Sequence, residues 1–256
     1  MSALGVTQRR VLRSEWIKLS TLRSTLIAFA AAVAIVGGIG LLAAWLAVAD
    51  WDTMTAAERA DLSVTGRVLG GRLFAQLAIG VVGAMAITGE YATGMIRATL
   101  AAVPRRLPVL WAKLALYAAI SWVLMTASSL FAFFAGNEIL SAHWQFSISD
   151  PGVLRAVLMS GVTLTAVCLI ALALGFVLRN TAAAISAIVG IVLVAPILGD
   201  LAPGVAQYLP HGAMGALVTI EPTTHVLQPW PGALLLVLYV AAAIAAAAVT
   251  LTRKDA

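Results

Sequence analysis

Residues 26–48, LIAFAAAVAIVGGIGLLAAWLAV, form a run of 23 residues without a charged side chain. A helix needs about 20 apolar residues to cross the hydrocarbon core of a membrane. Five basic residues at positions 9–23 precede the run. The run is longer than the apolar core of a secretory signal, which has roughly 7–15 residues. This stretch therefore predicts a retained membrane-spanning helix.

Similar charge-free runs continue to the end of the chain. They lie at residues 73–89, 114–136, 156–178, 181–199 and 232–252. The whole chain of 256 residues is 62% hydrophobic and only 11% charged, whereas a soluble domain carries about 25% charged residues. We therefore expect an all-α membrane protein with six spans, built as a single transmembrane domain over residues 1–256.

One further charge-free run, residues 201–220, is not expected to span the membrane. It contains Pro203, Pro210 and several glycines. These residues would interrupt a helix and leave backbone groups unpaired, which lipid does not tolerate. We expect short helices that dip into the outer face of the bundle, within an outer re-entrant segment over residues 200–231.

The basic residues predict the orientation. With six spans and both ends in the cytoplasm, twelve of the sixteen Lys and Arg residues lie on the cytoplasmic side. Cytoplasmic loops of membrane proteins carry this excess. We expect a multi-pass protein of a bacterial inner membrane with both termini inside. The net charge of +5 is explained by this topology, so no nucleic-acid partner is expected.

Residues 7–23 predict an amphipathic helix before the first span. Leu12, Trp16 and Leu19 follow an i, i+4, i+7 spacing, and Arg13 and Lys18 supply basic heads. Such a helix can lie in the headgroup plane of the bilayer with the Trp side chain at the boundary. The alternative is a basic flank that only fixes the orientation of the first span.

The sequence offers no catalytic, cofactor-binding or metal-binding motif. It lacks the G-x-x-x-x-G-K-[ST] loop that cradles ATP phosphates and lacks Cys/His clusters with metal-ligand spacing. The predicted spans also carry no charged residue at mid-depth, although ion-coupled transporters usually need one. We expect no enzyme activity and no cofactor on this chain.

The segment between the second and third runs, residues 89–113, reads GEYATGMIRATLAAVPRRLPVLWAK. Residues 93–103 predict a short helix along the membrane surface, because Ile96, Leu100 and Val103 make one apolar side. Pro104 and Pro108 are expected to end it before the third span. The alternative is a solvated basic loop that only obeys the topology rule.

This segment resembles the cytoplasmic coupling segment of ABC-2 type transporter permeases. The residues that fall on the family pattern are Glu90, Tyr91, Thr93, Gly94, Ile96, Leu100, Pro104, Arg105, Arg106 and Lys113. Met95 departs from it, because the family more often has a small polar residue there. The basic N-terminal helix, the turn at residues 174–181 and the segment at residues 208–217 also look like parts of that family, so the resemblance covers nearly the whole chain.

The resemblance implies a permease subunit of an ATP-driven exporter. It implies an ABC ATPase on a separate chain, which would hold the ATP and Mg, and a second permease copy. Residues 90–108 would then couple the two proteins, and we expect Ile96 and Leu100 to dock into a cleft on the ATPase. Two alternatives remain: a secondary transporter that works without ATP, and a membrane anchor or sensor without a transport path.

Overall fold

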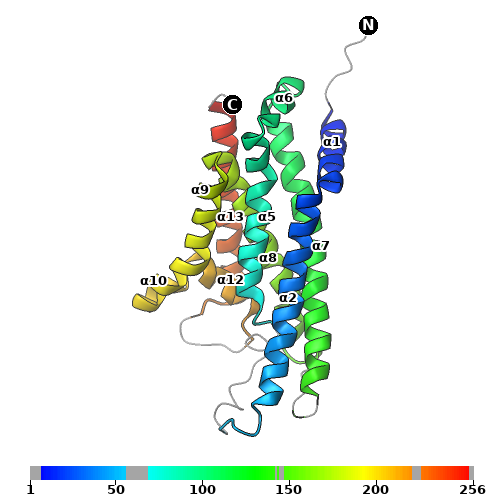
Figure 1. The fold of residues 1–256 in the computed structure, drawn as a ribbon. Helices are drawn as coiled ribbons and strands as arrows, with labels where there is room; N and C mark the ends of the chain where they lie inside the picture. The colour runs from blue at the N-terminus through cyan, green and yellow to red at the C-terminus, as the bar shows by residue number, and fades with distance from the viewer. Residues whose placement is uncertain (1–6, 56–68, 142, 144–146, 221–225, 254–256) are drawn as a thin grey trace.

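The computed structural model describes residues 7–55, 69–141, 143, 147–220 and 226–253, and every regular element within them is helical. Figure 1 shows the long helices running side by side as one elongated bundle. The all-α prediction is therefore confirmed.

Five helices of the described residues are long and apolar enough to cross a membrane. They are α2 (Arg23–Ala49), α5 (Arg72–Ala92), α7 (Leu107–Leu140), α8 (Val153–Leu178) and α13 (Pro229–Arg253). Helix α8 packs against α5, α7 and α13, and most of its length is buried. The chain is a multi-pass membrane protein with α8 at the centre of its bundle.

The fifth predicted span is divided into three pieces. Helix α9 (Thr181–Val189) continues into the π-helix η1 (Gly190–Val194) and then into α10 (Ala195–Leu201). The apolar part, Thr181–Ile197, is shorter than the other five candidate spans. Figure 1 shows this segment leaving the α6 end of the bundle and running along its side. The count of six spans stays a prediction.

Two short helices follow, α11 (Pro203–Ala206) and α12 (Pro210–Val218), where the sequence predicts short helices. Helix α12 packs against α8 and α13. The Arg155 guanidinium donates to the carbonyls of Leu217 and Thr219 at 3.0 and 2.9 Å, so it holds the C-terminal end of α12 against α8. The depth of this segment in a membrane stays a prediction, and residues 221–225 lie outside the described part of the chain.

The predicted N-terminal helix is present as α1 (Gln8–Thr21), but its faces differ from the expectation. Val11, Glu15 and Leu19 are buried against the bundle, whereas Trp16 is 51% exposed. The expected stripe of Leu12, Trp16 and Leu19 is thus divided between two faces. The exposed Trp16 side is the one available to lipid headgroups, and the interfacial position of α1 stays a prediction.

Helix α7 begins earlier than expected. It starts at Leu107 and includes Pro108 in its first turn, where the missing N–H of proline has no helical partner to lose. At 1.5 Å per residue its 34 residues span roughly 50 Å, well beyond the hydrocarbon core of about 30 Å. Part of α7 therefore extends out of that core.

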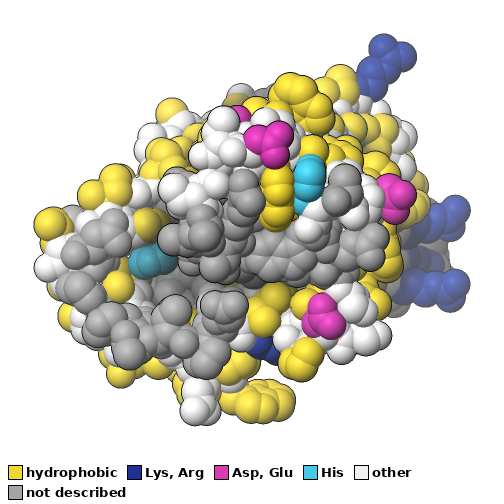
Figure 2. All heavy atoms as spheres, turned by 90° about the horizontal axis from the view of Figure 1, so that it is seen from below, with side chains coloured by type: hydrophobic (Ala, Val, Ile, Leu, Met, Phe, Trp, Pro, Cys, Tyr) yellow, Lys and Arg dark blue, Asp and Glu magenta, His cyan; other side chains and the backbone are white. Residues whose placement is uncertain are grey.

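Exposed acidic residues lie at one end of the bundle. Helix α1, the short helix α6 (Met95–Ala102) and the end of α13 lie together at one end (Figure 1). The opposite end shows Asp and Glu side chains among hydrophobic ones (Figure 2). The exposed acidic residues at the ends of α2 and α7 and before α8 are Asp50, Asp52, Glu138 and Asp150.

Candidate functional site

The corner between α5 and α6 is set by one glycine. Gly94 has φ 71°, in the left-handed region that L side chains rarely adopt. Its N–H donates to the Tyr91 carbonyl and the Thr93 N–H donates to the Gly89 carbonyl, which closes the last turn of α5. A short separate helix therefore follows α5 at an angle, as the sequence predicts.

Helix α6 turns its aliphatic residues toward the bundle. Ile96 is 2% exposed and belongs to the core that includes Leu19 of α1. Leu100 is half-buried and packs against Val11 and Val109. Ile96 is thus buried within this chain and Leu100 is half-buried there, and the docking of these two side chains into a cleft on the ATPase stays a prediction.

The opposite face of α6 is exposed. It carries Ala98, Ala101 and Ala102, with Arg97 beside them, whereas Met95 lines the cavity next to Glu90. The three alanine positions follow i, i+3 and i+4 spacing and so lie on one side of the helix. The result is a small apolar strip that faces away from the bundle, next to the exposed Pro104 and Arg105.

Two of the predicted coupling residues join other helices to this corner. Arg106 donates to the Leu251 carbonyl at 3.1 Å, near the end of α13. The Arg179 guanidinium lies 5.4 Å from the centre of the Tyr91 ring, within the range of a cation–π contact. Arg179 itself sits in the left-handed region at the turn between α8 and α9. The corner is thus connected to α8 and α13 as well.

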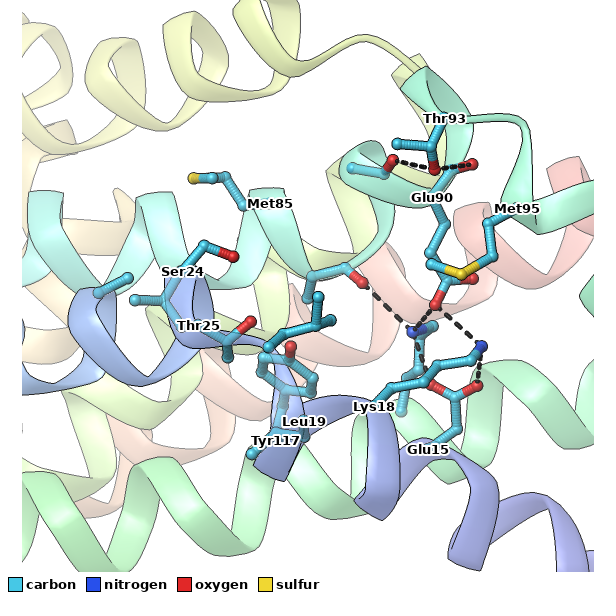
Figure 3. A pocket seen from close by; sticks show the side chains of 16 residues that line it. Glu15, Lys18, Leu19, Ser24, Thr25, Met85, Glu90, Thr93, Met95 and Tyr117 are labelled. Atoms are coloured by element: carbon cyan, nitrogen blue, oxygen red, sulfur yellow. Dashed lines mark hydrogen bonds and ion pairs between the residues drawn. The ribbon is translucent and has the colours of Figure 1, made fainter.

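A cluster of four charged side chains lies behind α6. We call Glu15, Lys18, Glu90 and Lys113 the charge cluster. They come from α1, α5 and α7, and Figure 3 shows Glu15, Lys18 and Glu90 pointing toward one another. Lys113 lies 2.6 Å from Glu15 and 2.7 Å from Glu90, while Lys18 lies 2.7 Å from Glu15 and 3.0 Å from Glu90. Each ammonium therefore bridges both carboxylates.

The cluster also reaches α6 and the backbone of α5. Lys18 Nζ donates to Thr99 Oγ1 at 3.2 Å, and Lys113 Nζ donates to the Ala86 carbonyl at 3.2 Å. Four helices, α1, α5, α6 and α7, thus meet through polar contacts at this point. A displacement of α6 would be passed to α5 and α7 through these contacts and through buried Ile96.

The cluster is buried and formally neutral. Side-chain exposure is 3% for Glu15, 5% for Glu90 and 3% for Lys113, and 23% for Lys18. Two carboxylates and two ammoniums cancel. Removal of one member of such a buried set leaves an uncompensated charge, which costs about 3–5 kcal/mol in comparable cases.

The two members on α1 have shifted acidities. Burial by itself would raise the pKa of Glu15, but the ammoniums of Lys113 and Lys18 outweigh it, so this pKa is lowered. Burial by itself would lower the pKa of Lys18, but Glu15 and Glu90 outweigh it, so this pKa is raised. Both groups are therefore held in their charged forms at neutral pH.

A cavity of about 220 Å³ adjoins the cluster (Figure 3). Its lining includes the charge cluster and the hydroxyl-bearing side chains of Ser24, Thr25 and Tyr117. Apolar side chains, among them Leu22, Val82 and Met85, line it as well, and Figure 3 shows Met85 and Ser24 on the side away from Glu15 and Lys18. It lies where α1 meets α2, between these helices and α5.

Sequence reasoning found part of this site and missed part. Glu90 and Lys113 lie on the coupling pattern, but the pattern does not say that they touch. Glu15 was not expected at all. One signal for it was available: it is the sole acidic residue of α1 and stands four residues from Val11 and from Leu19. An acid in line with an apolar helix face needs a buried cation, and Lys113 supplies it.

The comparisons with known proteins bear on the same region. A protein-family model described as ABC-2 family transporter protein matches residues 11–197, which is well over half of the chain. The matched part includes most of α1, all of α6 and the charge cluster. Neither a curated protein nor a solved structure matches the chain.

Proposed function

The chain belongs to the ABC-2 family of transporter proteins, and from this premise we propose that it is the permease of an ATP-driven exporter whose ATPase is a separate chain. The exposed strip of α6 is the single observation that carries the proposal furthest. An apolar strip on a helix that faces water favours a contact with another protein. Ala98, Ala101 and Ala102 supply that strip at the end of the bundle.

The proposed mechanism starts with a push on α6. ATP binding would draw the ATPase subunits together, and α6 would move with the surface on which it sits. Because Thr99 and Ile96 tie α6 to α1 and the core, the movement would reach α5 and α7. A rigid short helix suits this role, since a flexible loop would absorb the displacement.

The orientation follows from the same proposal. The end that carries α1, α6 and the end of α13 would face the cytoplasm, where the ATPase lies, and the end with Asp50, Asp52 and Asp150 would face outward. The basic residues of α1 and of the segment 97–113 support it by the positive-inside rule. Both chain termini would then be cytoplasmic, in the inner membrane.

Co-purification tests the proposal. We expect the tagged full-length chain, extracted from its own membranes, to bring an ABC ATPase with it. Ala98→Glu together with Ala101→Glu should abolish this association, because two carboxylates would be desolvated in an apolar contact. Ala49→Glu, an exposed alanine at the opposite end of α2, is the matched control. Retention of the ATPase by the α6 variant would contradict the proposed contact.

The proposal includes two permease copies around the path. The support is the family resemblance and the prevalence of symmetric pairs among oligomers. Crosslinking of the active complex in membranes should give a permease dimer. An active complex with a single permease chain would overturn this part and leave the ATPase contact untouched.

A secondary transporter would behave differently. Its transport would continue in vesicles that contain the chain alone with an ion gradient. Transport that requires ATP and the second chain supports the exporter, and transport by the isolated chain supports the alternative.

A further inference from the structure

The cavity beside the charge cluster has features that the proposed coupling does not use. Coupling needs the four charges to hold helices together, and it needs no open volume. Yet about 220 Å³ lies between the cluster and Met85, at the joint of α1 and α2. A water molecule occupies about 30 Å³ of liquid, so the cavity has room for roughly seven groups of that size.

One atom of the charge cluster points to a ligand. Glu90 Oε1 accepts from both lysines, but Glu90 Oε2 is buried and accepts no hydrogen bond from any described residue. The Glu90 side chain is 5% exposed and lines the cavity. An unpaired buried acceptor is costly, and a charged acceptor more so. A hydrogen-bond donor in the cavity would remove this cost.

The neutrality of the cluster restricts the kind of donor. Glu15 and Glu90 are already balanced by Lys18 and Lys113, each within 3.0 Å. An ammonium or a carboxylate on the ligand would add a charge that nothing in the cluster compensates, at high cost in a dry site. A neutral hydroxyl supplies one donor and adds no charge.

The rest of the lining selects hydrocarbon. Leu22, Ala28, Val82 and Met85 supply apolar lining, and Figure 3 shows Met85 on the side away from Glu15 and Lys18, with Ser24 beside it. Leu22 and Met85 are 43% and 42% exposed, so this side opens at the surface of α2 and α5. A molecule dissolved in the bilayer would reach the cavity through that opening, with its tail outward.

We propose that this cavity binds a neutral amphiphile, with its hydroxyl donating to Glu90 Oε2 and its hydrocarbon chain lying against Leu22, Val82 and Met85. Ser24, Thr25 and Tyr117 place further hydroxyls in the lining. The site lies beside α1 and α6, so an occupied cavity would stiffen the joint between α1 and α2. Binding itself depends on neither the ATPase nor transport.

Gly89 allows a blocking variant that keeps the fold. It lines the cavity, it is helical, and a Cβ added to it meets nothing within 4 Å. Gly89→Leu therefore adds a bulky side chain at the wall of the cavity, and its Cβ displaces no neighbour. Gly38→Leu is the matched control, because Gly38 is also helical with open space and lies in α2 away from this cavity.

The experiment uses the full-length chain in lipid nanodiscs and a photoreactive octanol that carries a diazirine on its chain. We expect labelled peptides to contain Met85 or residues 22–25, with the same labelling in Gly38→Leu and at least about a tenfold loss in Gly89→Leu. Unlabelled n-octanol should compete about tenfold better than heptyl methyl ether, which has no donor for Glu90. Octylammonium and octanoate should also compete less well than n-octanol.

The outcomes separate cleanly. Equal labelling of wild type and Gly89→Leu, equal competition by the ether, or stronger competition by octylammonium overturns the proposal. Lipid extracts of the purified proteins then identify the source. A neutral lipid retained by the wild type and lost in Gly89→Leu identifies a bilayer lipid. Retention of none, together with displacement by n-octanol, identifies an exchangeable amphiphile.

Discussion

Lys113 Nζ lies 2.6 Å from Glu15 Oε2 and 2.7 Å from Glu90 Oε1, so one ammonium of α7 holds a carboxylate of α1 and a carboxylate of α5. All three side chains are at most 5% exposed. This arrangement fixes α1 against the bundle at the level of α6. Because Lys18 of α1 also donates to Thr99 of α6, a movement of α6 would be transmitted to the N-terminal helix.

The two lysines of the cluster should differ in their effect on stability. Lys113→Met leaves two buried carboxylates with one partly exposed cation, and we expect a loss of about 3–5 kcal/mol. Lys18→Met should cost less, because Lys18 is 23% exposed and water screens the charges around it. Thermal unfolding of both variants in the same detergent measures the difference. Equal melting temperatures would refute the central place given to Lys113.

The cluster also predicts how stability depends on pH. Folding lowers the pKa of Glu15 from its ordinary value of 4.5. Its contribution to the free energy of unfolding is therefore fully present above 4.5 and is lost as the pH falls through the lower pKa of the folded state. The pKa of Lys18 is raised from 10.5, so its contribution is present below that value and is lost as the pH rises through the higher folded pKa.

Between these two limits, the stability contributed by Glu15 and Lys18 should not change with pH. Melting temperatures measured across the pH range should therefore show an acid limb that Glu15→Gln weakens and an alkaline limb that Lys18→Met weakens. A steep change near neutral pH that both variants remove would contradict this account.

The sequence was sufficient for most of the helices, because these depend on apolar runs. It did not predict the corner at Gly94, since the expected surface helix over residues 93–103 ran through that residue. Four of the spans predicted from the sequence begin and end within a few residues of the bounds of α2, α5, α8 and α13. The sequence did not show which face of a short helix is buried. Ile96 and Leu100 make an apolar side by spacing, and spacing is the same whether that side meets its own bundle or a partner.

The charge cluster lay beyond sequence reasoning for a related reason. Glu15 and Glu90 are 75 positions apart, and nothing in their local context specifies that Lys113 meets both. Only the packing of α1 against α7 and of α5 beside them brings the three together. Pro108 was misjudged because a proline ends a helix in its interior yet fits the first turn of the next one.

Gly94 should be sensitive to substitution because of its backbone and not its surroundings. A Cβ at Gly94 meets nothing within 4 Å, but φ 71° costs a non-glycine residue roughly 1–2 kcal/mol. Gly94→Ala should destabilise by about that amount, and Gly94→Asn by less. Gly38→Ala in α2 is the control, where alanine should stabilise by roughly 0.5–1 kcal/mol. Unfolding that is insensitive to Gly94→Ala would show that the corner relaxes freely.

Orientation can be tested with single cysteines, since Cys168 is fully buried and gives little background. We expect an impermeant maleimide to label Thr53→Cys in intact cells and to label Ala98→Cys only after the membrane is opened. Both positions are exposed at opposite ends of the bundle. Labelling of Ala98→Cys from outside would reverse the proposed orientation.

The contact of α6 with an ATPase is the central claim, and site-directed crosslinking measures it most directly. A thiol-reactive photo-crosslinker on Ala98→Cys, in membranes that contain the assembled complex, should join the chain to the ATPase. The same probe on Ala49→Cys, at the far end of α2, should not. The account is contradicted if the complex assembles and Ala98→Cys gives no ATPase adduct, or if Ala49→Cys gives the same adduct.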